Sequence, residues 1–228
     1  MSVSVEEEVA AARAATTALL DHLDRLDDLA APSLLPGWTR AHVVAHLTGN
    51  ARSHVRMLDG CLSGAVVAQY PGNAEGRAAE IDGLAVDPGP VVGAHRTACA
   101  KLDQRWSRMT PEHWERHVRR LNAAPQPARG LVWSRWREVE VHRVDLGVGY
   151  GPPDWDRRFA DRLLTGLLAR PDLPPMVVVA EGTERPVGAG GGPRVSGSVH
   201  TLAAWLMGRD GGPLDVAGGA LPEIPAWR

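Results

Sequence analysis

Pairs of metal-ligand residues four positions apart are the first chemical feature of this sequence. The chain has nine histidines. On a helix, residues four apart lie on one face, one turn apart, so such a pair could hold a divalent metal ion from two sides. The pairs are His42/His46, His113/His117 and Glu138/His142. With so many histidines and glutamates, some pairs arise by chance, and spacing alone does not select among them.

The neighbours of His113 and His117 argue against a metal there. Three arginines, Arg116, Arg119 and Arg120, lie in the same segment. Their positive charges oppose the binding of a cation. We therefore predict that this pair lies on the solvated surface.

The segment that contains His42 and His46 also contains His54. Its apolar stripe consists of Val44, Leu47, Ala51, Val55 and Leu58. A helical wheel centred on that stripe places His54 nearest its centre, His46 on its flank and His42 nearly opposite. We expect His54 to be a buried core histidine with its hydrogen bonds satisfied.

Glu138 and His142 lie in a segment rich in tryptophan and valine, which predicts a half-buried helix. An ionised glutamate in such a place requires a partner. A metal ion is one candidate, and the side chains of Arg135 and Arg137 are the others.

The elements that would position these residues are mainly helical. Helices are predicted over residues 5–30, 39–60, 91–109 and 131–149, with Thr39 as the N-cap of the second, and they suggest a four-helix bundle. A glycine-rich connection is expected between 60 and 90. A helix at 156–169, strands at 175–180 and 193–198, a helix at 199–208 and a last strand in LDVAG follow. The fold class is α+β, with a helical bundle over residues 1–153 and a small α+β domain over 154–228.

Composition excludes several classes of function. With 25 Lys+Arg against 27 Asp+Glu, the formal net charge is −2, which does not suit binding to nucleic acid. Three glutamates near the N-terminus and the lack of a long apolar run predict a cytoplasmic protein without a membrane segment. We expect a monomer.

The two cysteines, Cys61 and Cys99, lie 38 residues apart without the CxxC spacing of a zinc finger. They fit a reducing compartment. Neither adjoins a histidine in the sequence, so we expect each to be an inert small residue. Metal ligands must then be histidines and carboxylates.

Four segments resemble the mycothiol-dependent maleylpyruvate isomerases, with the motifs in matching order and spacing. They are SLLPGWTRAHVVAHLTGNA (33–51), WREVEVHRVDLG (136–147), VSGSVHTLAAWLMGR (195–209) and LPEIPAWR (221–228). The resemblance spans nearly the whole chain and is weakest between residues 60 and 130. It implies a DinB-like four-helix bundle with one divalent metal, typically zinc.

The resemblance also implies roles for individual residues. It assigns the metal ligands to His46, eight residues after Trp38, and to Glu138 and His142. It places a functional arginine at Arg209, which would pair with a carboxylate of the substrate. Arg209 could instead only complement the dipole of the helix that ends there. No residue is assigned to binding of the thiol.

The reaction that the resemblance implies is conversion of maleylpyruvate to fumarylpyruvate in gentisate degradation. Reversible addition of a thiol, mycothiol, would let the double bond rotate, assisted by a site with two histidines and one carboxylate that leaves positions open for substrate. Alternatives are the same reaction with ergothioneine, or a mycothiol S-transferase acting on another electrophile. A zinc-dependent regulatory protein is disfavoured because the sequence lacks an H-x-x-x-C-x-x-C arrangement.

Overall fold

The structure is a computed structural model that describes residues 4–121 and 123–226. The chain forms two units, the first ending at Val148 and the second beginning at Gly149. The sequence predicts a boundary after residue 153. The short 3-10 helix Pro152–Asp154 (η1), which that boundary divides, lies in the second unit.

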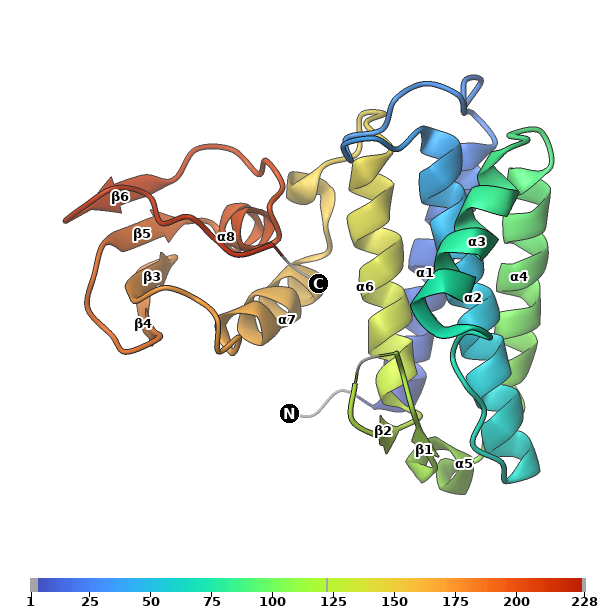
Figure 1. Cartoon of the computed structure of the whole chain (residues 1–228). Coiled ribbons are helices and arrows are strands. Elements are labelled where there is room, and N and C mark those ends of the chain that lie inside the picture. Colours follow the sequence, from blue (N-terminus) through green and yellow to red (C-terminus); the bar gives the residue numbers. More distant parts are fainter. Residues whose placement is uncertain (1–3, 122, 227–228) are drawn as a thin grey trace. The chain divides into compact units, whose positions relative to one another are not determined.

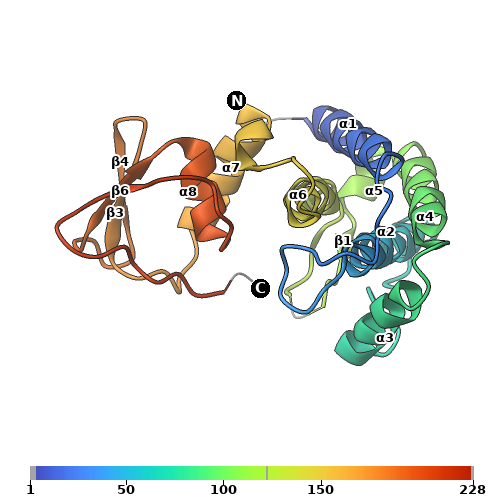
Figure 2. The same cartoon turned by 90° about the horizontal axis from the view of Figure 1, so that it is seen from above.

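The first unit is built mainly from helices (Figure 1). They are α1 Val5–Leu23, α2 Arg40–Ser63, α3 Asn73–Ala85, α4 Val91–Trp106, α5 Pro111–Glu115 and α6 Gly130–Asp145, with strands β1 His117–Val118 and β2 Gln126–Pro127 between α5 and α6. Helices α1, α2, α4 and α6 pack side by side, as Figure 2 shows from above. Helix α2 packs against α4 and α6, while α1 packs closely against α6 and less extensively against α4. The predicted helical bundle is confirmed.

Apolar side chains fill the interior of this bundle. Leu19, Leu47, Leu58, Leu102 and Leu131 come from all four helices and are fully buried. Each contributes about 1.5–3 kcal/mol by leaving water. Along the described part of the chain, no helix combines the length and apolar character needed to cross a membrane.

Local sequence signals set where helices α1 and α2 begin. Ser4 caps α1 and forms a reciprocal capping box with Glu7. Thr39 caps α2 as predicted, and its partner at the third helical position is His42, whose Nδ1 accepts from the Thr39 backbone N–H at 3.2 Å. Helix α2 is closed at its C-terminus by the capping residue Gly64, which adopts the left-handed conformation with φ 77°.

Helix α3 occupies part of the stretch that the sequence predicts to be a glycine-rich connection, so that prediction is wrong. Its N-cap is Gly72, which supplies no side-chain hydrogen bond, and its buried residues are Ile81 and Ala85. With so short an apolar stripe, the helical period is weak in the sequence. The helix forms where it can pack against α2.

His113 and His117 do not share a helix face. His113 lies in the short helix α5, where its Nδ1 lies 3.2 Å from the backbone nitrogen of Thr110, and His117 lies in β1. His117 is exposed and His113 is half-buried. The structure thus supports no metal site at this pair, and the predicted surface position holds for His117.

The second unit is a small α+β domain (Figure 1). After η1 it contains α7 Arg157–Leu168, β3 Met176–Ala180, β4 Thr183–Val187, β5 Arg194–Gly197, α8 Val199–Leu206 and β6 Asp215–Ala217. The strands form one sheet in the order β4-β3-β5-β6, with β3 and β5 parallel and the other pairs antiparallel. Helices α7 and α8 pack together, and α8 contacts β5. The sequence predicts all of these elements except β4 and η1.

Strand β4 was not expected because its residues, TERPV, are mostly exposed and polar. It is the edge of the sheet and pairs with β3 through a two-residue turn. Both turn residues have positive φ, 48° at Glu181 and 82° at Gly182, as a tight hairpin requires.

His54 is completely buried, as the sequence predicts. However, neither of its ring nitrogens has a hydrogen-bond partner among the described residues, so the expectation of satisfied hydrogen bonds is not met. Burial, together with the charge of Arg135, lowers the pKa of His54 from 6.5 to about 3. The ring therefore stays neutral in the folded protein down to acidic pH.

Replacing His54 by leucine should make the fold less sensitive to acid. Above pH 6.5 the ring is neutral in both the folded and the unfolded chain. As the pH falls below 6.5, the unfolded chain takes up a proton that the folded chain does not, so stability is lost towards the folded pKa of about 3. Between pH 7 and pH 5 this group costs about 2 kcal/mol.

Urea unfolding of both proteins at the two pH values, with a chelator present, measures this difference. The leucine variant should lose about 2 kcal/mol less free energy of unfolding than the parent protein. A His117→Leu variant, altered at an exposed histidine, serves as the control. Equal losses for parent and His54→Leu would contradict the assignment.

Candidate functional site

Helices α2 and α6 bring three metal-ligand side chains together inside the first unit. They are His46 from α2, and Glu138 and His142 from α6. One ligand atom from each lies within 4.8 Å of the others. Because α2 packs directly against α6, residues 92 positions apart in sequence become neighbours.

One carboxylate oxygen is the centre of the cluster. Glu138 Oε2 lies 2.9 Å from His46 Nε2 and 3.5 Å from His142 Nε2. The two imidazole rings meet edge to face with centroids 4.5 Å apart. Both histidines are buried, and the Glu138 side chain is 13% exposed, so the three groups form a nearly closed polar site.

These contacts control the protonation of the three groups. Burial raises the pKa of Glu138, but the contacts with His142 and His46 outweigh burial and hold this pKa well below its usual range. Burial lowers the pKa of His46 to about 4. Burial also lowers the pKa of His142, but hydrogen bonds to Asp145 and Glu138 dominate and raise it. At neutral pH the site therefore holds an ionised carboxylate and a neutral His46.

Asp145 orients His142. Its Oδ2 lies 2.8 Å from His142 Nδ1, and the residue is 1% exposed. The imidazole Nδ1–H donates to this carboxylate, which leaves Nε2 directed at Glu138. A carboxylate behind a histidine in this way fixes the ring and strengthens it as a metal ligand.

Arg77 of α3 contacts the other face of His46. Its Nη2 lies 3.0 Å from His46 Nδ1. A guanidinium has donors only, so Nδ1 must accept, and the ring proton of His46 is on Nε2, where it donates to Glu138. To bind a metal through Nε2, His46 must carry its proton on Nδ1 instead, facing the Arg77 donor. The contact with Arg77 thus favours the tautomer of His46 that could not bind a metal through Nε2.

The sequence leaves open whether Glu138 pairs with a metal or an arginine. In the structure Arg135 turns away from it and donates to Leu47 O at 2.9 Å and Asn50 Oδ1 at 3.0 Å. Arg137 and Arg120 do lie within range of the Glu138 charge: burial lowers the pKa of both, and Glu138 opposes that effect. The contacts of Glu138 at hydrogen-bond distance are with the two histidines.

A pocket of about 590 Å³ in the first unit is linked to this cluster by charge, although none of the three cluster residues lines it. Tyr70 and Arg120 line it, and both are within range of the Glu138 charge. Burial raises the pKa of Tyr70, so its hydroxyl keeps its proton at neutral pH. The cavity thus offers a phenol and a guanidinium to a small anionic molecule.

Most of the first unit matches the model of a known protein family. The profile described as "Mycothiol maleylpyruvate isomerase N-terminal domain" matches residues 9–147, which include all three cluster residues. The chain belongs to this family. The search of curated proteins found no match to the chain.

Two solved structures resemble the chain over nearly its full length. One is a crystal structure of the mycothiol-dependent maleylpyruvate isomerase, with a TM-score of 0.92 and 27% sequence identity, covering 99% of this chain and 98% of the other. The second, a histidine-to-alanine mutant of that enzyme, has the same TM-score and coverage at 26% identity. The similarity to a mycothiol maleylpyruvate isomerase therefore extends through both units.

Arg209, the other residue that the resemblance singles out, lies just after α8 in the second unit. Gly208 takes a left-handed conformation, with φ 73°, and the Arg209 backbone N–H closes the helix on Ala204 O at 2.9 Å. The half-buried guanidinium donates to Met207 O at 2.7 Å. This contact at a helix C-terminus is one that the dipole favours, and a role towards substrate remains a proposal.

The sequence does not predict the contacts of Asp145 and Arg77 with the two histidines of the cluster. Asp145 follows His142 by three residues, a spacing that places both on one helix face, so a signal was present. Arg77 lies in the unpredicted helix α3, and no pattern in the sequence links it to His46.

Changing Asp145 to asparagine should weaken the binding of zinc to this member of the isomerase family. The variant retains the shape of the side chain but loses the charge that supports His142. We expect the dissociation constant for zinc to rise about tenfold, at the lower end of the effect of such supporting carboxylates. Competition with a chromogenic chelator measures this dissociation constant. The control is Asp59→Asn, since Asp59 of α2 pairs with Arg105 rather than with a cluster residue. An unchanged constant would show that Asp145 does not support a ligand.

Changing Arg77 to methionine should strengthen metal binding. The variant removes the donor that opposes a proton on His46 Nδ1 and retains much of the side-chain length. We expect the dissociation constant for zinc to fall about tenfold, equivalent to about 1.4 kcal/mol. Arg52→Met is the matched control because Arg52 pairs with Glu80 rather than with a cluster residue. Weaker binding in the Arg77→Met variant would contradict this effect of Arg77.

Proposed function

We propose that this protein is a metal- and thiol-dependent isomerase that converts maleylpyruvate to fumarylpyruvate, with mycothiol as the thiol. The observation that carries the proposal is the convergence of His46, Glu138 and His142 within 4.8 Å inside a bundle that matches the isomerase family. The solved relatives are named for the same reaction and the same thiol. A single metal, zinc or another divalent ion, would bind at this cluster.

The three residues fit such an ion chemically. Two imidazoles and one carboxylate are a ligand set of catalytic zinc sites, which leave a further position open for water or substrate. The Nε2–H groups of the two histidines donate to the negatively charged Glu138, in the position that a cation would take. A bound divalent ion supplies a Lewis acid for a keto oxygen or a thiol sulfur.

The thiol must come from outside the cluster. Isomerisation about a double bond requires a nucleophile that adds, allows the bond to rotate and leaves again. A thiolate suits an electron-poor alkene because it is soft and departs readily. The two cysteines of the chain are buried, Cys61 in α2 and Cys99 in α4, and neither belongs to the metal-ligand cluster.

Arginines of this chain are suited to hold the substrate, which is a dicarboxylate. Arg120 lines the cavity of about 590 Å³, and Arg77 lies beside His46. A planar guanidinium binds a carboxylate through two parallel hydrogen bonds. We propose that Arg77 binds a carboxylate of the substrate when a metal ion is bound to His46. We also propose that Arg209 of the second unit binds a carboxylate.

Two alternatives share the same cluster. One is the same isomerisation with ergothioneine, and the other is transfer of mycothiol to a different electrophile. Both use a soft thiol and a metal, so the residues of the site do not separate them. The identity of the thiol and of the electrophile must be tested directly.

The test is a spectrophotometric assay with maleylpyruvate and purified protein. Mycothiol, ergothioneine, glutathione and no thiol are compared, each with zinc and with a chelator. We expect turnover with mycothiol and zinc, and loss of at least 100-fold in a Glu138→Gln variant, which removes the charge of the central ligand. Turnover with ergothioneine but not with mycothiol would identify ergothioneine as the thiol. No turnover by zinc-loaded protein with any thiol would overturn the isomerase assignment and favour transfer to another electrophile.

Changing Arg209 to lysine should impair turnover without affecting the metal. Lysine retains the charge but cannot form the two-pronged contact with a carboxylate. We expect kcat/KM for maleylpyruvate to fall about tenfold or more while the zinc content per chain is unchanged. Arg194→Lys, at an exposed ion pair on β5, is the control. Loss of zinc from Arg209→Lys, or unchanged kinetics, would contradict a role in binding substrate.

A further inference from the structure

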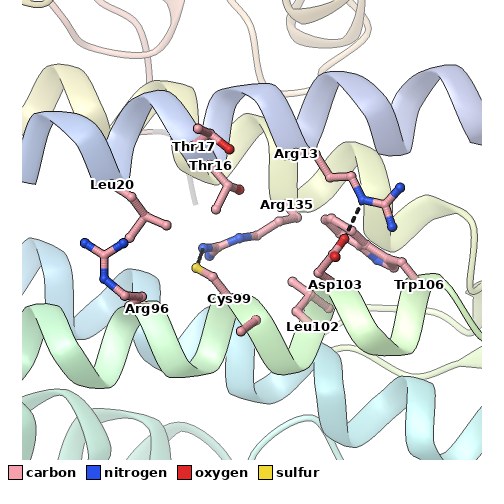
Figure 3. A pocket seen from close by; sticks show the side chains of 11 residues that line it. Arg13, Thr16, Thr17, Leu20, Arg96, Cys99, Leu102, Asp103, Trp106 and Arg135 are labelled. Atoms are coloured by element: carbon pink, nitrogen blue, oxygen red, sulfur yellow. Dashed lines mark hydrogen bonds and ion pairs between the residues drawn. The ribbon is translucent and has the colours of Figure 1, made fainter.

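A second pocket lies between α1 and α4, the pair of neighbouring bundle helices with the less extensive contact. Its volume is about 310 Å³. Figure 3 shows Arg135 of α6 extending between these two helices, with its guanidinium end at Cys99 of α4. None of the three metal-ligand residues lines this pocket.

The thiol of Cys99 is in contact with two nitrogen groups. Its Sγ lies 3.4 Å from His95 Nε2, one helical turn earlier in α4. The Nη2 of Arg135 lies 3.4 Å from the same sulfur. A nucleophilic cysteine requires a base that takes its proton and a positive charge that stabilises the thiolate, and these two groups can supply both.

The hydrogen bonds of Thr48 determine which nitrogen of His95 is the base. Thr48 Oγ1 donates its single proton to Val44 O at 2.7 Å. It can therefore only accept from His95 Nδ1, which lies 3.2 Å away. With the proton on Nδ1, His95 Nε2 presents a lone pair to the Cys99 thiol. Burial and the charge of Arg135 lower the pKa of His95 well below its usual value, so the ring is neutral, and its imidazolium can form only as an ion pair with the Cys99 thiolate.

Arg135 supplies a positive charge that is not neutralised by a carboxylate within the described residues. It is fully buried, and its acceptors are Leu47 O, Asn50 Oδ1 and the Cys99 sulfur. Its Nε finds no acceptor among the described residues, nor does Nε1 of Trp106, which is 6% exposed and lines the same pocket. The charge of Arg135 is therefore available to stabilise a thiolate at Cys99, whose sulfur it contacts.

We propose that Cys99 is a nucleophilic thiol and that the pocket between α1 and α4 takes a small α,β-unsaturated carbonyl compound. The apolar side chains of Leu20, Leu102 and Trp106 line the pocket and suit a carbon skeleton. The carbonyl oxygen becomes negative during addition, and the buried charge of Arg135 beside the Cys99 sulfur favours that charge electrostatically, without direct contact. A compound of this class fits the volume of about 310 Å³ better than a peroxide does, since a peroxide needs far less space.

The reaction is an addition in which all atoms are retained. His95 Nε2 takes the thiol proton, and the sulfur electron pair forms a bond to the β-carbon of the alkene. The electrons of the carbon–carbon double bond move onto the carbonyl group as an enolate. The proton then passes from His95 to the α-carbon, so the product is a thioether and nothing leaves.

This site and the proposed isomerase reaction are separate. The isomerase requires a metal and an added thiol, whereas Cys99 modification requires neither. The experiment can therefore be carried out on protein treated with a chelator. Failure of one proposal does not affect the other.

The test uses N-ethylmaleimide, an α,β-unsaturated carbonyl compound, on the full chain, with mass spectrometry to follow each cysteine. Cys61 is the internal control because both cysteines are similarly buried, 8% exposed at Cys99 and 3% at Cys61, and burial raises the pKa of Cys61. We expect Cys99 to react at least tenfold faster than Cys61 in the native protein. In urea the two rates should become similar.

Two variants separate nucleophilic activation from simple access. His95→Asn removes the base, and Thr48→Val retains the histidine but removes the acceptor that fixes its proton on Nδ1. Both should lower the Cys99 rate at least tenfold and leave the Cys61 rate unchanged, with circular dichroism reporting the fold. If His95→Asn does not fold, Thr48→Val decides the question. A Cys99 rate no higher than that of Cys61, or unchanged in the folded variants, overturns the proposal.

Discussion

The charge of Glu138 inside the bundle is the constraint on which the rest of the first unit depends. A buried ionised carboxylate is strongly unfavourable unless charged or hydrogen-bonding groups surround it. Here one oxygen is shared by His46 and His142, and the contacts are close enough to keep the carboxyl group ionised. Helix α6 places Glu138 and His142 one turn apart, and α2 must pack against α6 in one register to bring in His46. The geometry that offers three ligand atoms to a cation is therefore also the geometry that makes this interior stable.

Helix α6 carries much of the polar chemistry of the bundle. Besides Glu138 and His142 it supplies Asp145, which holds His142, and Arg135, which reaches towards α4. These residues are surrounded by fully buried apolar side chains from all four helices. Their hydrogen bonds replace water and fix the side chains before any ligand arrives. Such preorganisation is what an active site needs, because little rearrangement then remains for the reaction itself.

The sequence predicts most of this arrangement for physical reasons that can be named. Helices α1 and α2 have clear apolar stripes and capping residues, Ser4 and Thr39, and the spacing of Glu138 and His142 requires only that α6 be a helix. Helix α3 escapes prediction because Ile81 and Ala85 alone do not produce a visible period, and Arg77 is missed with it. Strand β4 is missed because an exposed edge strand has no apolar alternation. Contacts between helices, such as that of Arg135 with Cys99, depend on packing that no local pattern encodes.

His95 and Cys99 illustrate the same limit. Their spacing of four residues is visible in the sequence, yet the sequence suggests an inert cysteine. The chemical meaning of the pair depends on Thr48 of α2, which fixes the tautomer, and on Arg135 of α6, which supplies the charge. For Cys61 the prediction of an inert residue agrees with the structure, since burial raises the pKa of its thiol.

Calorimetric titration of the chelator-treated protein with zinc, in buffers of different ionisation enthalpy, tests the central claim most directly. At pH 6.5, below the raised pKa of His142, we expect one ion per chain and release of a proton from His142, whose Nε2–H faces Glu138 where a cation would bind, while the proton of the neutral His46 moves to Nδ1. A Glu138→Gln variant should bind far more weakly. An absence of binding, binding without proton release at pH 6.5, or equal affinity in the variant would show that Glu138 does not organise a cation site.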